Sequence, residues 1–276
     1  MKAIKRVLYR WIDKKFLGGC SSYNSLDVRK SCRSKFQARQ MFAAHGVPHA
    51  KGTTFFNPFT AVRFAKEHGF PLVVKPNVSG FSRGSHFPIR NYTELWRAIF
   101  FARAWWPISV VEQYLEGKNY RVVVVDGEII SVIQRYPPFV DGDGSSSIDS
   151  LIDKENAIRK EMQLAPTIHY IEKSAKVIAY LKKQGLSLSS VVAEGTRVSL
   201  FHRVALAPGG VVEIVDKNSL PLENVELFTR VLSLFNANIF GIDAIFEEGI
   251  DKSYKDQKCI FLEVNSRPYL KMHDFP

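Results

Sequence analysis

Two carboxylates and one amide near the end of the chain have the residue types of a hard metal site. Asp243 lies inside the apolar run GIDAIF, and Glu263 and Asn265 lie at the end of the apolar run over residues 261–264. Because alternate residues of a strand share a face, Glu263 and Asn265 should point the same way. Oxygen-only ligands of this kind suit Mg²⁺ when nucleotide phosphates complete its coordination. The same residues could also be ordinary charges at the solvated ends of strands.

A lysine and a loop rich in glycine and serine could grip phosphates. Lys75 lies in PLVVKPN, an expected buried strand, where an apolar residue would be usual. A buried lysine is costly unless it is paired, so we expect a carboxylate or a phosphate to meet it. Residues 77–85 follow, with two glycines and three serines that allow close backbone approach to phosphates, and Arg83 adds charge. A β-turn with a surface arginine is the plainer alternative.

Two arginines are expected on the arms of a hairpin. In YRVVVVDGEIISVIQRY, Asp126-Gly127 is a strong signal for a type I′ turn, which should pair the strands that carry Arg121 and Arg135. Arginines on facing strands could meet across the hairpin and bind a substrate carboxylate. Charged positions on a surface strand would explain them as well.

The composition excludes several classes of protein. With 276 residues, 46% of them hydrophobic and 24% charged, the chain can form one large or two small domains with a real core. No apolar run approaches the ~18 residues of a membrane span, and the N-terminus lacks the apolar segment of a signal peptide. The three cysteines have no metal or disulfide spacing, so a reduced, cytoplasmic setting is expected. The formal net charge of +11 predicts acidic partners: nucleotide phosphates, a carboxylate substrate, nucleic acid or an anionic surface.

Residues 1–34 are expected to form an arm and a linker. Apolar residues recur at helical spacing through residues 1–17, between lysines and arginines, and Gly18-Gly19 ends the pattern. This amphipathic helix could pack on the same chain, contact a second copy in a homodimer or a partner protein, or meet an anionic surface. The stretch from Cys20 to Arg29 has the composition of a polar linker.

Capping residues mark three further helices. They are expected from Ser34 to Gly46, from Asn57 to Gly69 and from Asn91 to Trp105. The third is strongly apolar, so we expect it to be buried. Another strand is expected over residues 109–115.

The order of these features resembles an ATP-grasp ligase, in particular the ligase domain of cyanophycin synthetases and bifunctional glutathione synthetases. The matching pieces run from Lys35 to the C-terminus in family order and include the KPN strand with its loop, EQYLEGKNYRVVVVDGEII, DGDGSSSIDSLI, GGVVEIVD, GIDAIF and LEVNSRPYLKMH. The resemblance implies an α+β fold in which two subdomains with antiparallel sheets clasp ATP. It places a small subdomain over residues 35–112 and a core subdomain with the metal site over residues 113–276.

The resemblance also implies roles for single residues. Lys35 and Lys75 would contact the ATP phosphates, with Lys75 also near the adenine. The loop that closes over the phosphates would use Ser79, Gly80, Ser82, Arg83 and Gly84. The adenine hinge would be Glu112, Gln113, Tyr114 and Leu115. Asp243, Glu263 and Asn265 would hold one or two Mg²⁺ ions, for which Mn²⁺ could substitute.

Other positions would serve the substrate or depart from the family pattern. Arg203 or Arg267 would stabilise the developing acyl phosphate, and Arg121, Arg135 and His273 would contact substrate. Asn119 stands where an acidic residue usually pairs with the ribose. Residues 205–210 read Ala-Leu-Ala-Pro-Gly-Gly where relatives read approximately Asn-Leu-Ser-Thr-Gly-Gly. Relatives carry further domains, so part of the substrate-binding surface is expected to come from another chain.

The implied reaction is ADP-forming ligation of a carboxylate, on a small molecule or a peptide, to an amine. The carboxylate would attack the γ-phosphate of ATP, and the amine would displace phosphate from the acyl phosphate. The alternative is an ATP-binding subunit with weak or lost turnover that acts with a partner protein, since Asn119 and the altered loop fall beside the nucleotide. Nucleic-acid binding is disfavoured because the cationic residues are spread out, the aromatic residues are expected to be buried and no reader motif occurs.

Overall fold

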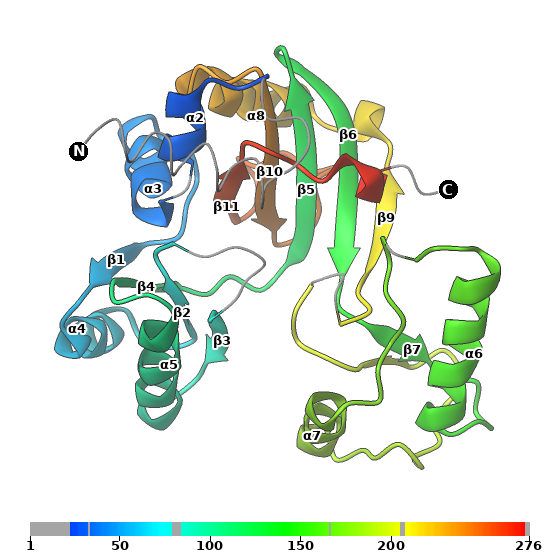
Figure 1. Cartoon of the computed structure of the whole chain (residues 1–276). Helices are drawn as coiled ribbons and strands as arrows, with labels where there is room; N and C mark the ends of the chain where they lie inside the picture. Colours follow the sequence, from blue (N-terminus) through cyan, green and yellow to red (C-terminus); the bar gives the residue numbers. More distant parts are fainter. Residues whose placement is uncertain (1–22, 33, 79–83, 166, 205–207, 274–276) are drawn as a thin grey trace, which may run out of the picture.

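Three antiparallel sheets organise the part of the chain that the structure describes. This computed structural model describes residues 23–32, 34–78, 84–165, 167–204 and 208–273. One sheet has the strand order β1-β4-β2-β3, one has the order β11-β10-β5-β6-β9, and the third pairs β7 with β8. Figure 1 shows them as three lobes, called here the small, large and third lobe. The α+β class with antiparallel sheets is confirmed.

The small lobe contains the four-stranded sheet and two helices. Its elements are β1 (Gly52–Phe55), α4 (Pro58–His68), β2 (Leu72–Pro76), β3 (His86–Ile89), α5 (Tyr92–Trp105) and β4 (Ser109–Gln113). The side chains of Asn57 and Asn91 accept backbone hydrogen bonds at the starts of α4 and α5, as predicted. Gly69 ends α4 with a φ of 74°, which favours glycine. Both helices bury apolar residues in one cluster with the sheet.

The large lobe is built on the five-stranded sheet. Its strands are β5 (Lys118–Val125), β6 (Glu128–Tyr136), β9 (Val211–Val215), β10 (Ile239–Phe246) and β11 (Cys259–Asn265). β5 and β6 form the expected hairpin, and Asp126 and Gly127 both have positive φ, as a type I′ turn requires. One face of the sheet is apolar and packs on α3 (Lys35–Ala44) and α8 (Leu222–Leu234). Because strand residues alternate, the other face carries Arg121 and Asp243.

The third lobe has its own apolar cluster. It contains β7 (Phe139–Asp141), α6 (Ile148–Glu161), α7 (Ala175–Lys183) and β8 (Arg197–Ser199). The guanidinium of Arg159 is buried there and donates to the carbonyls of His169 at 2.6 Å and Gly209 at 2.9 Å. These bonds tie α6 to the segment that leads into β9. The predicted boundary at residue 112 falls within β4, and the domain boundaries stay a prediction.

Two local expectations were wrong. The stretch from Cys20 to Arg29 was expected to be a linker, but it contains the start of α2 (Leu26–Ser31), which Ser25 caps. This helix forms because Val28 is buried against the large lobe, a tertiary contact that polar composition does not reveal. The helix α5 was expected to be buried, but only one side of it is; Trp96, Phe100, Phe101 and Trp105 are exposed.

The amphipathic arm over residues 1–17 lies outside the described residues. Two short 3-10 helices, η1 (Lys217–Ser219) and η2 (Leu270–His273), complete the elements. Within the segments that the structure describes, no helix is long and apolar enough to cross a bilayer.

Candidate active site

A row of charged side chains crosses the polar face of the five-stranded sheet. Asp243 on β10 lies directly opposite Arg121 on β5 and opposite Glu263 on β11. Asn265, two residues after Glu263, pairs in register with Gly241. The strands therefore bring the predicted metal ligands of two distant segments onto neighbouring positions of one face.

Asp243 is held by two arginines. Arg121 Nε donates to Asp243 Oδ1 at 2.6 Å and Arg121 Nη2 to Oδ2 at 2.8 Å, while Arg135 Nη2 lies 3.1 Å from Oδ2. Burial alone would raise the pKa of Asp243, but the two guanidinium groups outweigh it and hold the pKa below its usual value. Arg121 and Arg135 thus meet across the hairpin, but the carboxylate that they bind belongs to the chain itself.

Glu263 and Asn265 are more open than Asp243. The side chain of Glu263 is 37% exposed, and its Oε2 lies 3.9 Å from Lys35 Nζ. Asn265 Nδ2 donates to the carbonyl of Gly241 at 3.4 Å, so the side-chain oxygen of Asn265 points away from that carbonyl. Burial lowers the pKa of Lys35, while Glu263 opposes that shift and Lys75 adds to it.

The donor set fits Mg²⁺ in residue type and placement. Two carboxylates and an amide oxygen share one face, but two of the oxygens already accept from arginines. In the described part of the chain, no group of three or more His, Cys, Asp or Glu side chains could hold a metal alone. With Arg121, Arg135 and Lys35 close by, a divalent cation would meet local positive charge. We therefore expect the metal to need phosphate oxygens as additional ligands.

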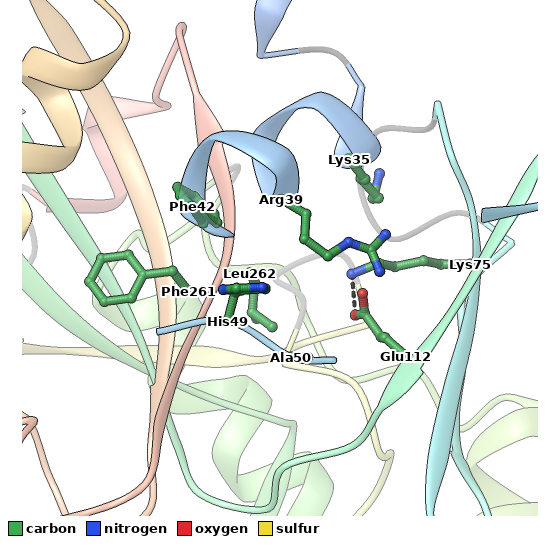
Figure 2. A pocket seen from close by; sticks show the side chains of 9 residues that line it. All are labelled: Lys35, Arg39, Phe42, His49, Ala50, Lys75, Glu112, Phe261 and Leu262. Carbon is green, nitrogen blue, oxygen red and sulfur yellow. Dashed lines mark hydrogen bonds and ion pairs between the residues drawn. The ribbon is translucent and has the colours of Figure 1, made fainter. Parts of the chain in front are cut away.

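A second group of charges lies where the small lobe meets β11. Lys75 on β2 donates a hydrogen bond to Glu112 on β4, and both side chains are about nine-tenths buried. The expectation that a carboxylate or a phosphate meets Lys75 is confirmed for the carboxylate. Figure 2 shows Arg39 and Lys75 reaching toward Glu112, with Lys35 lining the same pocket. Leu262 of β11 lines the same pocket, which joins this group to the sheet that carries Glu263.

This pocket attracts anions but is small. Its cavity volume is about 10 Å³, room for about one water. Both terminal nitrogens of Arg39 are buried and, among the described residues, have no hydrogen-bond partner. Burial lowers the pKa of Arg39, and Glu112 opposes that shift. A phosphate or carbonyl oxygen would satisfy these donors, but a nucleotide would require the lobes to separate.

The predicted adenine hinge runs from the end of β4 into the large lobe. The N–H of Gln113 donates to the carbonyl of Lys51 at 2.9 Å, and that of Tyr114 to the carbonyl of Pro71 at 3.1 Å. These two N–H groups are therefore occupied. The carbonyls of Tyr114 and Leu115, which follow the end of β4, and the N–H of half-buried Leu115 are the backbone groups through which adenine could bind.

The predicted phosphate loop is described only at its end. Ser79, Gly80, Ser82 and Arg83 lie outside the described residues. Gly84 has a φ of 71°, and a side chain there would clash with Pro76 and Trp105. Arg203 Nη2 donates to the carbonyl of Ser85. Arg203, which follows β8 of the third lobe, therefore contacts the end of this loop in the small lobe. Burial lowers the pKa of Arg203.

The remaining predicted residues are placed apart from one another. Asn119 Oδ1 accepts from Arg135 Nε at 2.7 Å, so the amide that replaces the expected acid positions an arginine. His273 Nδ1 lies 2.9 Å from Ser131 Oγ on β6. Arg267 is half-buried two residues after Asn265. Residues 205–207 of the altered loop lie outside the described residues.

Two residues of the site were missed from the sequence. Arg39 lies one helical turn after Lys35 on α3, and that i, i+4 spacing was the available signal. Asn24 is buried; it donates to the carbonyls of Ile239 at 2.7 Å and Ser266 at 3.0 Å, and accepts from the N–H of Asn238. It thereby ties the residues before α2 to the segment after Asn265. No sequence pattern indicated this contact.

Comparisons with known proteins agree with this geometry. No protein-family model matches the chain. A cyanophycin synthetase from Trichormus variabilis is 31% identical over 255 residues, which are 91% of this chain and 28% of that protein. A solved bifunctional glutathione synthetase from Pasteurella multocida has a TM-score of 0.64 at 22% identity, covering 92% of this chain and 35% of that one. The ATP-grasp ligase PsnB, complexed with a precursor variant, Mg and ADP, has a TM-score of 0.52 at 16% identity, covering 98% and 60%.

The fold is that of the ATP-grasp ligases, two antiparallel sheets with charged residues gathered between them. The chain is related in sequence to cyanophycin synthetases and bifunctional glutathione synthetases, over part of their length. The resemblance inferred from the sequence is thus confirmed. The chain spans 28% of the length of the cyanophycin synthetase that it matches.

Proposed function

We propose that the chain carries the nucleotide site and the phosphoryl-transfer chemistry of an ADP-forming carboxylate–amine ligase. The observation that supports this most is the row Arg121–Asp243–Glu263 across three strands, continued by Lys35 into the pocket of Lys75 and Glu112. It combines oxygen ligands for a cation with lysines for phosphates, the two needs of Mg²⁺-dependent phosphoryl transfer.

The residues would divide the nucleotide between the two sheets. Lys35, Arg39 and Lys75 would bind phosphate oxygens, and Glu112 with the hinge would bind adenine. Glu263, Asn265 and the remaining lone pairs of Asp243 would hold Mg²⁺, which supplies neutralisation of the phosphate charge. PsnB, of similar fold, was solved with Mg and ADP, which supports this division.

The chemistry has two balanced steps. A carboxylate oxygen attacks the γ-phosphorus, the bond to the bridging oxygen of the β-phosphate breaks, and ADP leaves. A neutral amine then attacks the acyl carbon, the bond to the phosphate oxygen breaks, and the amine gives its proton to solvent. Arg203 and Arg267 are the proposed stabilisers of the transferred phosphoryl group. Arg121 and Arg135 would position Asp243. They would contact substrate only through N–H groups that are not used in the ion pairs with Asp243.

Trapping the acyl phosphate tests the proposal. The chain is incubated with Mg²⁺, ATP, hydroxylamine and pools of amino acids or short peptides, and ADP and acyl hydroxamate are measured. We expect hydroxamate to form only when a carboxylate is present, and the hydroxamate and amide products together to match the ADP released. ADP release that is independent of any carboxylate would contradict ligase chemistry. Glu263→Gln, on the exposed side of the metal row, serves as the inactive control.

A second candidate is a nucleotide-binding subunit without turnover that acts with a partner protein. The observation in its favour is that two arginines already hold Asp243, while the pocket beside Lys75 has a volume of about 10 Å³. Nucleotide binding measured by calorimetry, together with no ADP formation from any acid pool, would favour this candidate over the ligase.

A further inference from the structure

The outer side of α5 differs from the surface of an ordinary helix. Leu95, Ala98, Ile99 and Ala102 face the sheet and are buried. A solvated helix normally shows mostly polar residues away from the core, but α5 exposes Trp96, Phe100, Phe101 and Trp105 there, beside the polar Thr93, Glu94 and Arg97. Phe100 is 71% exposed. A cluster of exposed aromatic side chains marks an interaction site more often than chance exposure.

Two aromatic residues, one just before α4 and one in its first turn, extend this surface. Phe59 contacts Trp96 with ring centroids 5.8 Å apart, and Phe56 lies under the guanidinium of Arg103 at 5.1 Å. Phe56 is 65% exposed and Phe59 64%. The aromatic face is therefore defined by the following residues: Phe56, Phe59, Trp96, Phe100 and Phe101. Figure 1 shows α4 and α5 at the end of the small lobe farthest from β10 and β11.

Cationic side chains are interleaved with these rings. Arg97 lies 5.9 Å from the centre of the Phe101 ring, and Arg103 lies over Phe56. The two helices carry four lysines and arginines against two glutamates. Aromatic residues mixed with arginines suit the boundary of an anionic bilayer, where rings enter the headgroup region and guanidinium groups meet lipid phosphates.

The same details argue against two other occupants. A second copy docked on this face would bring Arg97 and Arg103 toward their own counterparts, which like charges oppose. Nucleic acid would need free ring faces for base stacking. Here the Phe59–Trp96 and Phe100–Phe101 pairs meet edge to face, at 83° and 80°, and arginines lie over Phe101 and Phe56. Neighbouring side chains therefore already cover part of these rings. Insertion into a bilayer tolerates such cover, but stacking of bases on the ring faces does not.

We propose that the aromatic face docks the protein on an anionic lipid bilayer. The helix α5 would lie along the bilayer surface, with its rings among the headgroups. The pocket of Lys75 and Glu112 would lie on the side of the small lobe that faces away from the lipid. This binding uses none of the proposed catalytic residues and needs no nucleotide, so it stands or falls separately from the ligase proposal.

Tryptophan fluorescence measures this docking directly. The chain has four tryptophans, of which Trp96, Trp105 and Trp106 are exposed on or beside α5, and Trp11 lies in the arm. In a Trp11→Phe background the emission reports only the α5 region. Vesicles of phosphatidylcholine alone are compared with vesicles that contain roughly 30% phosphatidylglycerol, at low and high salt. We expect a blue shift, and quenching by brominated lipid, with the anionic vesicles at low salt.

Paired variants separate the apolar and the charged contributions. Trp96→Ser with Phe100→Ser should lower the vesicle partition coefficient at least about tenfold, and Arg97→Gln with Arg103→Gln should lower it about tenfold or more and weaken its salt dependence. The matched control is Tyr170→Ser with Ile178→Ser, two exposed apolar residues of the third lobe, which should change nothing. All these positions except Arg103 are exposed, so the variants should fold, and circular dichroism checks that they do.

Three results would overturn the proposal. One is the absence of binding to both kinds of vesicle. Another is binding that survives the Trp96→Ser, Phe100→Ser change but is lost when residues 1–17 are deleted, which would assign it to the arm. The third is a dimer seen by light scattering, or capture of single-stranded RNA, that the same double change abolishes, because the face would then serve a different occupant.

Discussion

Arg121 and Asp243 lie directly opposite each other on β5 and β10 and share two hydrogen bonds, of 2.6 and 2.8 Å. The planar guanidinium fixes the orientation of the carboxylate, and Arg135 adds a second cation 3.1 Å from Oδ2. Asp243 is thus a structural counter-ion as well as a proposed metal ligand. Glu263, its neighbour on β11, has no such arginine pair among the interactions described, and the two carboxylates should respond differently to the same substitution.

Replacing each carboxylate by its amide tests that difference. Asp243→Asn leaves two buried guanidinium groups without their counter-ion and should lower the free energy of unfolding by about 3–5 kcal/mol. Glu263→Gln, at a 37% exposed side chain, should change it by less than about 1 kcal/mol, yet lower Mg²⁺-dependent ADP formation about a hundredfold or more. Urea denaturation and the ADP assay measure the two quantities. Wild-type turnover in Glu263→Gln would remove Glu263 from the metal site.

The buried pair of Lys75 and Glu112 should behave as one unit. Lys75→Met removes the hydrogen-bond partner of the buried Glu112 carboxylate and, of the cations described, leaves only Arg39 and Lys35 near it, so it should lower the melting temperature and weaken ATP binding at least about tenfold. Adding Glu112→Gln removes the buried charge and should restore much of the stability but not the ATP affinity. If the double variant also recovers ATP binding, Lys75 has only a structural role. Calorimetry and thermal unfolding distinguish these outcomes.

Asn24 should stabilise the fold beside β11, the strand that carries Glu263 and Asn265. Its amide makes hydrogen bonds to Ile239, Asn238 and Ser266, all to backbone groups. Asn24→Ala should lower the free energy of unfolding by about 2 kcal/mol or more, because it leaves buried backbone groups unsatisfied. Ser25→Ala removes only the cap of α2 and should cost about 1 kcal/mol, which makes it the control. Equal losses in the two variants, measured by urea denaturation, would contradict this role.

His202 should make stability depend on pH. Burial lowers the pKa of His202 from 6.5 to about 4, and Arg203, Lys183 and His86 add to the shift. Between these values the unfolded chain binds a proton that the folded chain does not, so stability is complete above pH 6.5 and falls as the pH falls toward about 4. Melting temperatures across this range should decline less in His202→Gln. His86, whose pKa burial also lowers, acts in the same direction, so an unchanged profile in the double His86, His202 variant would exclude both.

The local elements followed from the sequence because their causes are local. Asn57, Asn91 and the Asp126-Gly127 turn act through hydrogen bonds and dihedral angles within a few residues, so their positions were predictable and are confirmed. The partner of Lys75 was predictable as a kind of group, since a buried ammonium needs an anion. The family resemblance rested on motif order, which is also a property of the chain alone.

The tertiary structure decided which of these residues meet. Arg121, Arg135 and Asp243 come from three strands, and only the register of β5, β6 and β10 brings the two guanidinium groups to one carboxylate. The same holds for the exposed side of α5: its sequence carries large apolar residues on more than one side, and the sheet can cover one side of a helix only. Contacts between distant segments depend on strand register and on which face of a helix meets its neighbour, and neither is encoded in the spacing of residues along one segment.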